Sequence, residues 1–109
     1  MRQVGILAAA AQYALTHNRD RLAQDHDHCR QLAEGLCGID GIEVDTEEVE
    51  TNMVFIGTGK HKAANLAQKL DELGIGVLAT EPSTLRAVTN LTFQADEVDR
   101  VIHAFKQIL

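Results

Sequence analysis

A stretch with a two-residue repeat, from Leu85 to Phe93, constrains the fold of this chain most. Leucine, alanine, threonine and phenylalanine occupy its odd-numbered positions, and Arg86 lies among the even-numbered ones. Because successive side chains of a β-strand point to opposite faces, this alternation is typical of a strand with one buried and one open face. The sequence therefore predicts a half-buried strand that carries an arginine.

Arg86 is the only charged residue of this stretch. Two parallel N–H groups of a guanidinium match the two oxygens of a carboxylate or a phosphate, and a rigid strand would fix their direction. The alternative is a structural salt bridge with one of the 16 acidic residues of the chain, because buried charges are usually paired. The pattern alone leaves both interpretations open.

The charge of the chain argues against a nucleic-acid-binding domain. The net charge is -6 over 109 residues, and no cluster of lysine and arginine provides the basic patch that such domains carry. The longest apolar run, Val4 to Ala11, is far shorter than the roughly 20 residues of a membrane span, and no signal-peptide cleavage pattern follows it. We therefore expect one cytoplasmic domain with neither a nucleic-acid nor a membrane partner.

Two helices are predicted in the first third of the chain. From residue 1 to about His17, apolar side chains cover most of the helix circumference, which predicts a buried helix. From Arg19 to Leu36, mostly apolar residues recur at spacings of four and three, a stripe suited to packing on another helix. Aromatic residues make up only 4% of the chain, so we expect an aliphatic core with closely approaching helices.

The remainder of the chain is predicted to form a small sheet with two more helices. Strands are expected at 42–45, 51–57, 75–79 and 85–93, and helices at 63–73 and 96–109. This order predicts an α+β fold in which two N-terminal helices precede a small, mostly antiparallel sheet with helices on one face. We divide the chain into connecting helices at 1–38 and a sheet-and-helix domain at 39–109.

The sequence contains no pattern of a catalytic or metal site. His26 and His28 would point nearly opposite ways on a helix, so they cannot bind one metal ion, and we expect a solvated helix face there. Cys29 and Cys37 would lie about 12 Å apart on one helix, too far for a disulfide, so we expect reduced and mostly buried thiols. The stretch Thr58–Lys60 lacks the spacing of a phosphate-binding loop.

The chain resembles the C-terminal part of the low-specificity L-threonine aldolases, pyridoxal-phosphate enzymes with the aspartate-aminotransferase-like fold. The matching stretches occur in the same order along essentially the whole chain, at 1–10, 13–15, 21–26, 32–36, 51–55 and 85–91. The resemblance implies the small C-terminal domain of a fold-type I enzyme. It also implies that the intact enzyme cleaves L-threonine or L-allo-threonine to glycine and acetaldehyde.

Two arginines gain expected roles from this resemblance. Arg86 matches the arginine that holds the α-carboxylate of the amino-acid substrate, and Arg2 matches a residue near the phosphate of the cofactor, pyridoxal 5'-phosphate. The lysine that forms the Schiff base belongs to the large domain upstream, and the lysines of this chain match none of its motifs: Lys60, Lys62, Lys69 and Lys106. We therefore expect this chain alone to contain no catalytic residue, to hold no cofactor and to be inactive. Its expected partners are the large domain and further copies in a homo-oligomer.

Three residues near the arginine depart from the family pattern. Asn90, Thr92 and Gln94 stand where the family often has His, Asp and Ser, and the loss of a serine N-cap would cost about 1 kcal/mol.

Two other interpretations of the chain come from different classes of protein. One is a non-catalytic dimerisation or interaction module whose first helix docks onto a partner or onto itself, and the other is a small amino-acid-sensing domain that uses Arg86.

Overall fold

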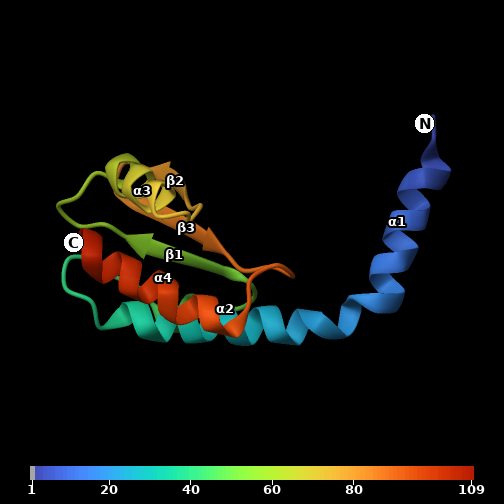
Figure 1. Cartoon of the computed structure of the whole chain (residues 1–109), viewed down its shortest axis with the longest axis horizontal. Coiled ribbons are helices and arrows are strands. Elements are labelled where there is room, and N and C mark those ends of the chain that lie inside the picture. Colours follow the sequence, from blue (N-terminus) through green and yellow to red (C-terminus); the bar gives the residue numbers. More distant parts are fainter. Residues whose placement is uncertain (1) are drawn as a thin grey trace.

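A computed structural model describes residues 2–109. The chain begins with two long helices that meet at a bend (Figure 1). The first part comprises helix α1 (Val4–His17), a 3-10 turn η1 (Arg19–Arg21) and helix α2 (Leu22–Cys37). The second part comprises η2 (Thr46–Glu48), β1 (Met53–Gly57), α3 (Ala63–Glu72), β2 (Leu78–Glu81), β3 (Thr84–Val88) and α4 (Ala95–Ile108).

The three strands form one antiparallel sheet with β3 in the middle, in the order β1-β3-β2. Leu85 and Ala87 of β3 are buried, as are Val54 and Ile56 of β1. Because residues two apart on a strand share a face, these four side chains define one covered face of the sheet. The predicted α+β fold with a mostly antiparallel sheet is confirmed.

Helices α2, α3 and α4 supply the rest of the core on that covered face. Their buried side chains join those of the strands in a single cluster whose largest fully buried apolar members are Phe105, Leu36, Ile56, Leu66, Leu70, Leu85 and Val54. Helices α2 and α4 run alongside each other below the strands in Figure 1. Helices α2, α3 and α4 therefore all pack on one face of the sheet, and no helix within residues 2–109 covers the other face.

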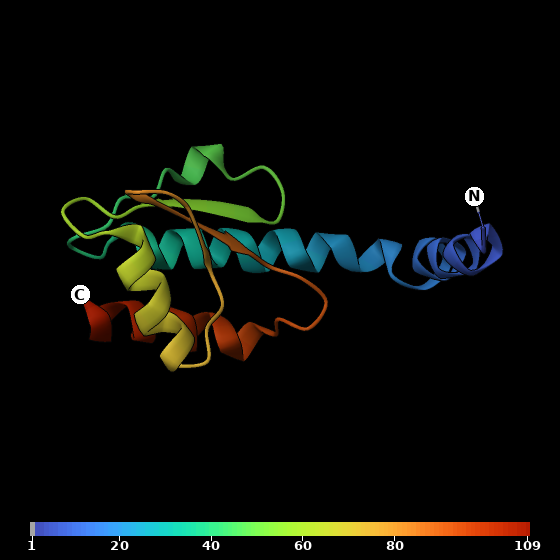
Figure 2. The same cartoon turned by 90° about the horizontal axis from the view of Figure 1, so that it is seen from above.

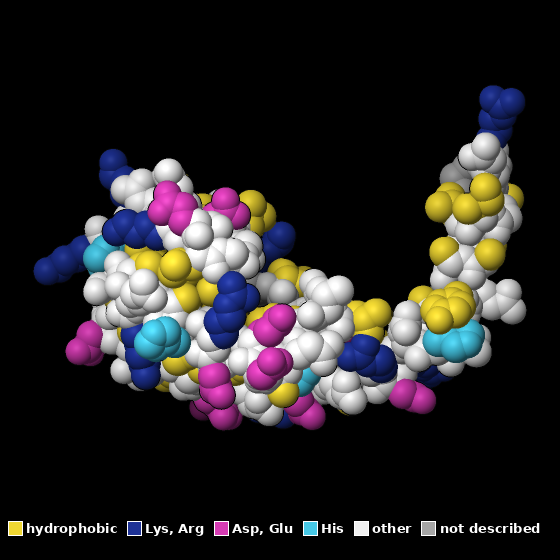
Figure 3. Space-filling model, in the orientation of Figure 1, with side chains coloured by type: hydrophobic (Ala, Val, Ile, Leu, Met, Phe, Trp, Pro, Cys, Tyr) yellow, Lys and Arg dark blue, Asp and Glu magenta, His cyan; other side chains and the backbone are white. Residues whose placement is uncertain are grey.

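Helix α1 departs from the prediction of a buried helix. Every residue of α1 is exposed, including Ile6 and Leu15, which are 68% and 67% exposed. The helix projects away from the sheet (Figures 1 and 2), and apolar side chains are visible along it in Figure 3. The core of the described residues is built from α2, α3, α4 and the strands, and no side chain of α1 belongs to it.

Some predicted strand boundaries are wrong, and local side-chain hydrogen bonds explain two of them. Residues 42–45 form only an isolated bridge between Glu43 and Gly57, because the Asp45 side chain accepts a hydrogen bond from the Glu47 N–H at 2.9 Å and starts η2. Strand β3 ends at Val88, and shortly afterwards the Asn90 side chain accepts a bond from the Thr92 N–H at 2.9 Å. Such an Asx turn replaces the extended backbone that alternation predicts.

No helix within residues 2–109 combines the length and apolar character needed to cross a lipid bilayer.

The packing predicts unequal costs for two truncations. Replacement of Phe105, which is fully buried, by alanine should lower the free energy of unfolding by about 3–5 kcal/mol because it removes core contacts and leaves a cavity. Leu15→Ala on exposed α1 should change it by about 0.5 kcal/mol or less. Urea unfolding followed by circular dichroism measures both, and equal costs would contradict the placement of α1 outside the core.

Candidate functional site

Arg86 lies on the open face of the sheet, opposite the helices. Its cross-strand partners are Phe55 on β1 and Leu78 on β2, and residues directly opposite across strands share a face. Phe55 and Leu78 are each 52% exposed, whereas Leu85 and Ala87 on either side of Arg86 are buried. The arginine is therefore the one charged member of a row of apolar side chains on an uncovered surface.

The guanidinium of Arg86 has no acidic partner among residues 2–109. The only ion pair described there joins Arg30 and Asp27 at 3.6 Å, so the structural salt bridge considered for Arg86 does not form in this part of the chain. The Arg86 Nε is buried and makes no hydrogen bond. A buried donor without a partner costs about 1–3 kcal/mol, so the site is suited to an acceptor from outside the chain.

Arg2, the second predicted site residue, lies far from Arg86. It is exposed and precedes α1, whose N-terminal end points away from the sheet in Figure 1. The structure therefore does not bring the two arginines together, and the expected roles of both residues stay predictions.

The described residues do not fit pyridoxal phosphate on their own. A lysine that forms a Schiff base is usually activated by burial, which lowers its pKa. The lysines of this chain are all exposed: Lys60, Lys62, Lys69 and Lys106. In the loop before α3 the Thr58 hydroxyl donates to the His61 backbone carbonyl at 2.7 Å, so its side chain serves the turn. Neither feature forms a cradle for a cofactor.

The residues around His28 correct the prediction of a solvated helix face. Asp25 is buried, and the Thr89 hydroxyl donates to its backbone carbonyl at 2.8 Å. The His28 ring meets Phe93 edge-on at a centroid distance of 6.3 Å. This part of α2 faces the chain that follows β3. No group of three His, Cys, Asp or Glu side chains able to hold a metal ion occurs in the described part of the chain.

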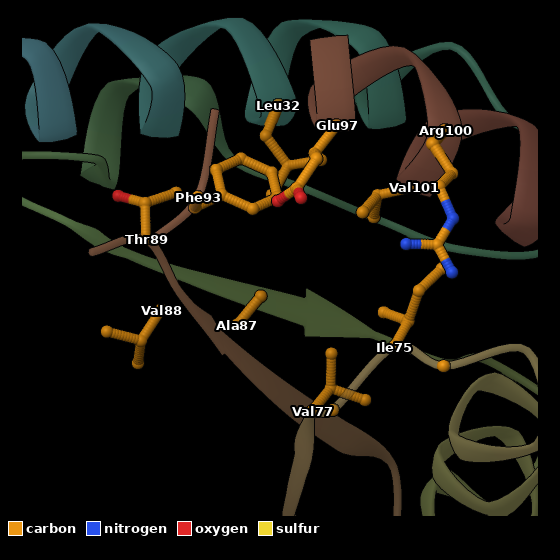
Figure 4. A pocket seen from close by; sticks show the side chains of 12 residues that line it. Leu32, Ile75, Val77, Ala87, Val88, Thr89, Phe93, Glu97, Arg100 and Val101 are labelled. Carbon is orange, nitrogen blue, oxygen red and sulfur yellow. The ribbon is translucent and has the colours of Figure 1, made fainter. Parts of the chain in front are cut away.

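A separate pocket of about 130 Å³ lies on the helix side of the sheet (Figure 4). Its walls come from the first turns of α4, the segment 74–77 before β2 and the end of β3, and Arg86 does not line it. Glu97 and Arg100 of α4 are its charged residues. Sequence reasoning missed both, because opposite charges three residues apart on a helix usually mark an ordinary solvent-exposed pair.

Comparison with known proteins places these features in a family context. The family model of the beta-eliminating lyases matches residues 1–59. The chain is 36% identical over 112 residues to low-specificity L-threonine aldolase 1 of Arabidopsis thaliana and 36% identical over 111 residues to the low specificity L-threonine aldolase of Escherichia coli K12. Each match covers 100% of this chain but 31% of the relative. The chain thus spans about a third of the length of these relatives.

Solved structures of low sequence identity share the fold. The cystine C-S lyase C-DES superposes with a TM-score of 0.73 at 18% identity, covering 94% of this chain and 28% of that one. The L-threonine-O-3-phosphate decarboxylase from Porphyromonas gingivalis gives a TM-score of 0.72 at 20% identity, covering 91% and 32%. These enzymes use the same arrangement of helices and strands within much longer chains.

The two cysteines should differ in reactivity. Burial raises the pKa of the Cys29 thiol, and the hydrogen bond with Thr89 and the charge of Arg30 offset this only in part. Cys37 is exposed. Because the thiolate is the reactive form, a maleimide at pH 8 should modify Cys37 quickly and Cys29 only after unfolding.

Peptide mass spectrometry locates the label, and Cys37→Ser should abolish the fast reaction. Equal rates for the two thiols in the folded chain would contradict the burial of Cys29.

Proposed function

Because the chain belongs to the beta-eliminating lyase family, we propose that it is the small C-terminal domain of a threonine-aldolase-like lyase. The intact enzyme would use pyridoxal 5'-phosphate to cleave L-threonine or L-allo-threonine to glycine and acetaldehyde in the cytoplasm. The observation that carries this proposal is the 36% identity to threonine aldolases, which extends over the whole chain. The antiparallel sheet with helices on one face supports it, because the structural neighbours share that fold.

In this proposal Arg86 holds the α-carboxylate of the substrate. It lies in the central strand, on the open face, with a buried Nε that has no partner in the described part of the chain. A guanidinium can donate two parallel hydrogen bonds to a carboxylate, and such charge-assisted bonds are about twice as strong as neutral ones. A substrate fixed in this way keeps the bond to be broken in one orientation relative to the cofactor, which supplies the electron sink when bound.

Arg2 would act in a different region, near the phosphate of the cofactor. The exposed N-terminal end of α1 is where a second domain or subunit can reach it. A large domain that contacts both α1 and the open face of the sheet would bring the surroundings of Arg2 and Arg86 into one site. The proposed partners are therefore that domain and further copies of the enzyme in a homo-oligomer.

The chain alone is proposed to be inactive and to hold no cofactor. Its lysines are exposed and match none of the Schiff-base motifs of the family. An absorbance spectrum of the purified chain mixed with pyridoxal phosphate and then dialysed tests this directly. Retention of a yellow protein-bound chromophore would contradict the proposal.

A second candidate function, a non-catalytic dimerisation or interaction module, is favoured by one observation. Every residue of α1 is exposed although the helix is rich in apolar side chains. Light scattering at several protein concentrations separates the two functions, because a module that dimerises through α1 should dissociate on Leu15→Gln. The lyase proposal assigns the homo-oligomer to the intact enzyme and requires no self-association of this chain through α1.

A chimera tests the role of Arg86. In the Escherichia coli K12 relative, the matching third of the enzyme is replaced by this chain, and cleavage of L-threonine is measured. Arg86→Lys should lower kcat/KM about tenfold to a hundredfold, because a lysine cannot reproduce two parallel bonds to a carboxylate whose loss costs about 1.5–3 kcal/mol.

Arg30→Lys, at an exposed position of α2, is the matched control and should leave kcat/KM unchanged. An active chimera that is equally insensitive to both substitutions would exclude Arg86 as the carboxylate ligand.

A further inference from the structure

The pocket beside α4 has an apolar floor. Residues from five parts of the chain make up this floor: Leu32, Ile75, Val77, Ala87, Phe93 and Val101. Figure 4 shows Ala87 and Val77 on the strand side, across from Phe93 and Val101. Its volume of about 130 Å³ is close to the roughly 150 Å³ of an engineered cavity that accepts benzene. The space is therefore sufficient for a branched aliphatic side chain.

Two opposite charges lie at this pocket without forming an ion pair with each other. Glu97 and Arg100 both line it, while the only ion pair among residues 2–109 is on α2. Glu97 is half-buried, and the one bond described for its carboxylate is a long one of 3.4 Å from the Gln94 N–H. Most of its acceptor capacity is therefore free for a ligand.

The guanidinium of Arg100 is held by the backbone carbonyl of Leu73, at the end of α3. The Arg100 Nη2 donates to this carbonyl at 2.8 Å, and the other N–H groups of the guanidinium remain available for a ligand. Gly74 has a positive φ of 81°, and a Cβ there would lie 2.9 Å from Arg100 Nη2. The positive φ favours glycine at this position, and a side chain there would displace the guanidinium from its place beside the Leu73 carbonyl.

We propose that this pocket binds a small zwitterion with an apolar side chain, an α-amino acid of about the size of leucine. The ammonium group pairs with Glu97, the carboxylate pairs with Arg100, and the side chain lies on the apolar floor. A simple anion or cation would use only one of the two charges, and an uncharged apolar molecule would use neither. The pocket is distinct from the site at Arg86. Ala87 lines the pocket, and because it follows Arg86 on β3, the two side chains point to opposite faces of the sheet.

Titration of the ¹⁵N-labelled chain with L-leucine tests the proposal. We expect saturable shifts of the amide signals of residues 74–77, 89–93 and 95–101. Three analogues each lack one feature: 4-methylpentanoate lacks the ammonium, 3-methylbutylamine lacks the carboxylate and glycine lacks the apolar side chain. Each should bind about tenfold more weakly or worse, as expected for the loss of one charge-assisted or apolar contact.

Variants locate the site. Glu97→Gln should weaken L-leucine binding about tenfold while its amide oxygen can still accept the Gln94 N–H bond. Asp99→Asn, an equal charge change on the exposed side of α4, should leave binding unchanged. Ala87→Val should abolish binding by filling the floor, and an unchanged melting temperature shows that the fold is intact.

Two results would overturn the proposal. One is the absence of saturable shifts with L-leucine, or equal binding of L-leucine and 4-methylpentanoate. The other is an affinity that falls equally in Glu97→Gln and Asp99→Asn, or that is retained by a folded Ala87→Val chain. Saturable shifts confined to the amide signals of Phe55, Leu78 and Arg86 would place L-leucine on the open face of the sheet and would also overturn this proposal. A failure here and a failure of the carboxylate role of Arg86 can therefore be told apart.

Discussion

The structure depends on the burial of one face of β3 against the helices. Leu85 and Ala87 on that face join the core, and this contact fixes the register of the central strand with both neighbours. A slip of one residue would turn Arg86 toward the core and Leu85 toward the open face. Transfer of an unpaired guanidinium into an apolar core costs far more than the sheet could recover. The packing that stabilises the fold therefore also keeps the Arg86 side chain on the open face of the sheet.

The spacing of apolar residues in the sequence predicted the helices and strands whose buried face follows a regular repeat. The alternation in β3 placed Arg86 on the face opposite Leu85 and Ala87, and the helical stripes predicted α2, α3 and α4 to within a few residues. Contacts between distant residues were beyond such reasoning. The helical spacing of Asp25 from the buried Cys29 and Leu32 places it on their face of α2. The hydrogen bond that its backbone carbonyl accepts from the Thr89 hydroxyl, 64 positions later in the chain, could not be predicted from that spacing.

The candidate sites were predictable to different degrees. Arg86 stood out because it is a charge within an alternating apolar stretch, although the absence of an acidic partner in the described residues required the structure. Glu97 and Arg100 gave no such signal. They line a pocket only because the folded chain places the segment 74–77, between α3 and β2, beside α4. Two neighbouring residues of β3, Arg86 and Ala87, thus belong to opposite surfaces with different chemistry.

The exposure of α1 has a consequence for how this part of the chain gains its order. A helix of 14 residues is only marginally stable in water by itself, because helix nucleation is costly and its hydrogen bonds barely offset the lost backbone entropy. No core side chain of the described protein holds α1 in place. If the proposed large domain covers α1, the formation of this helix and the recognition of that domain are one coupled event.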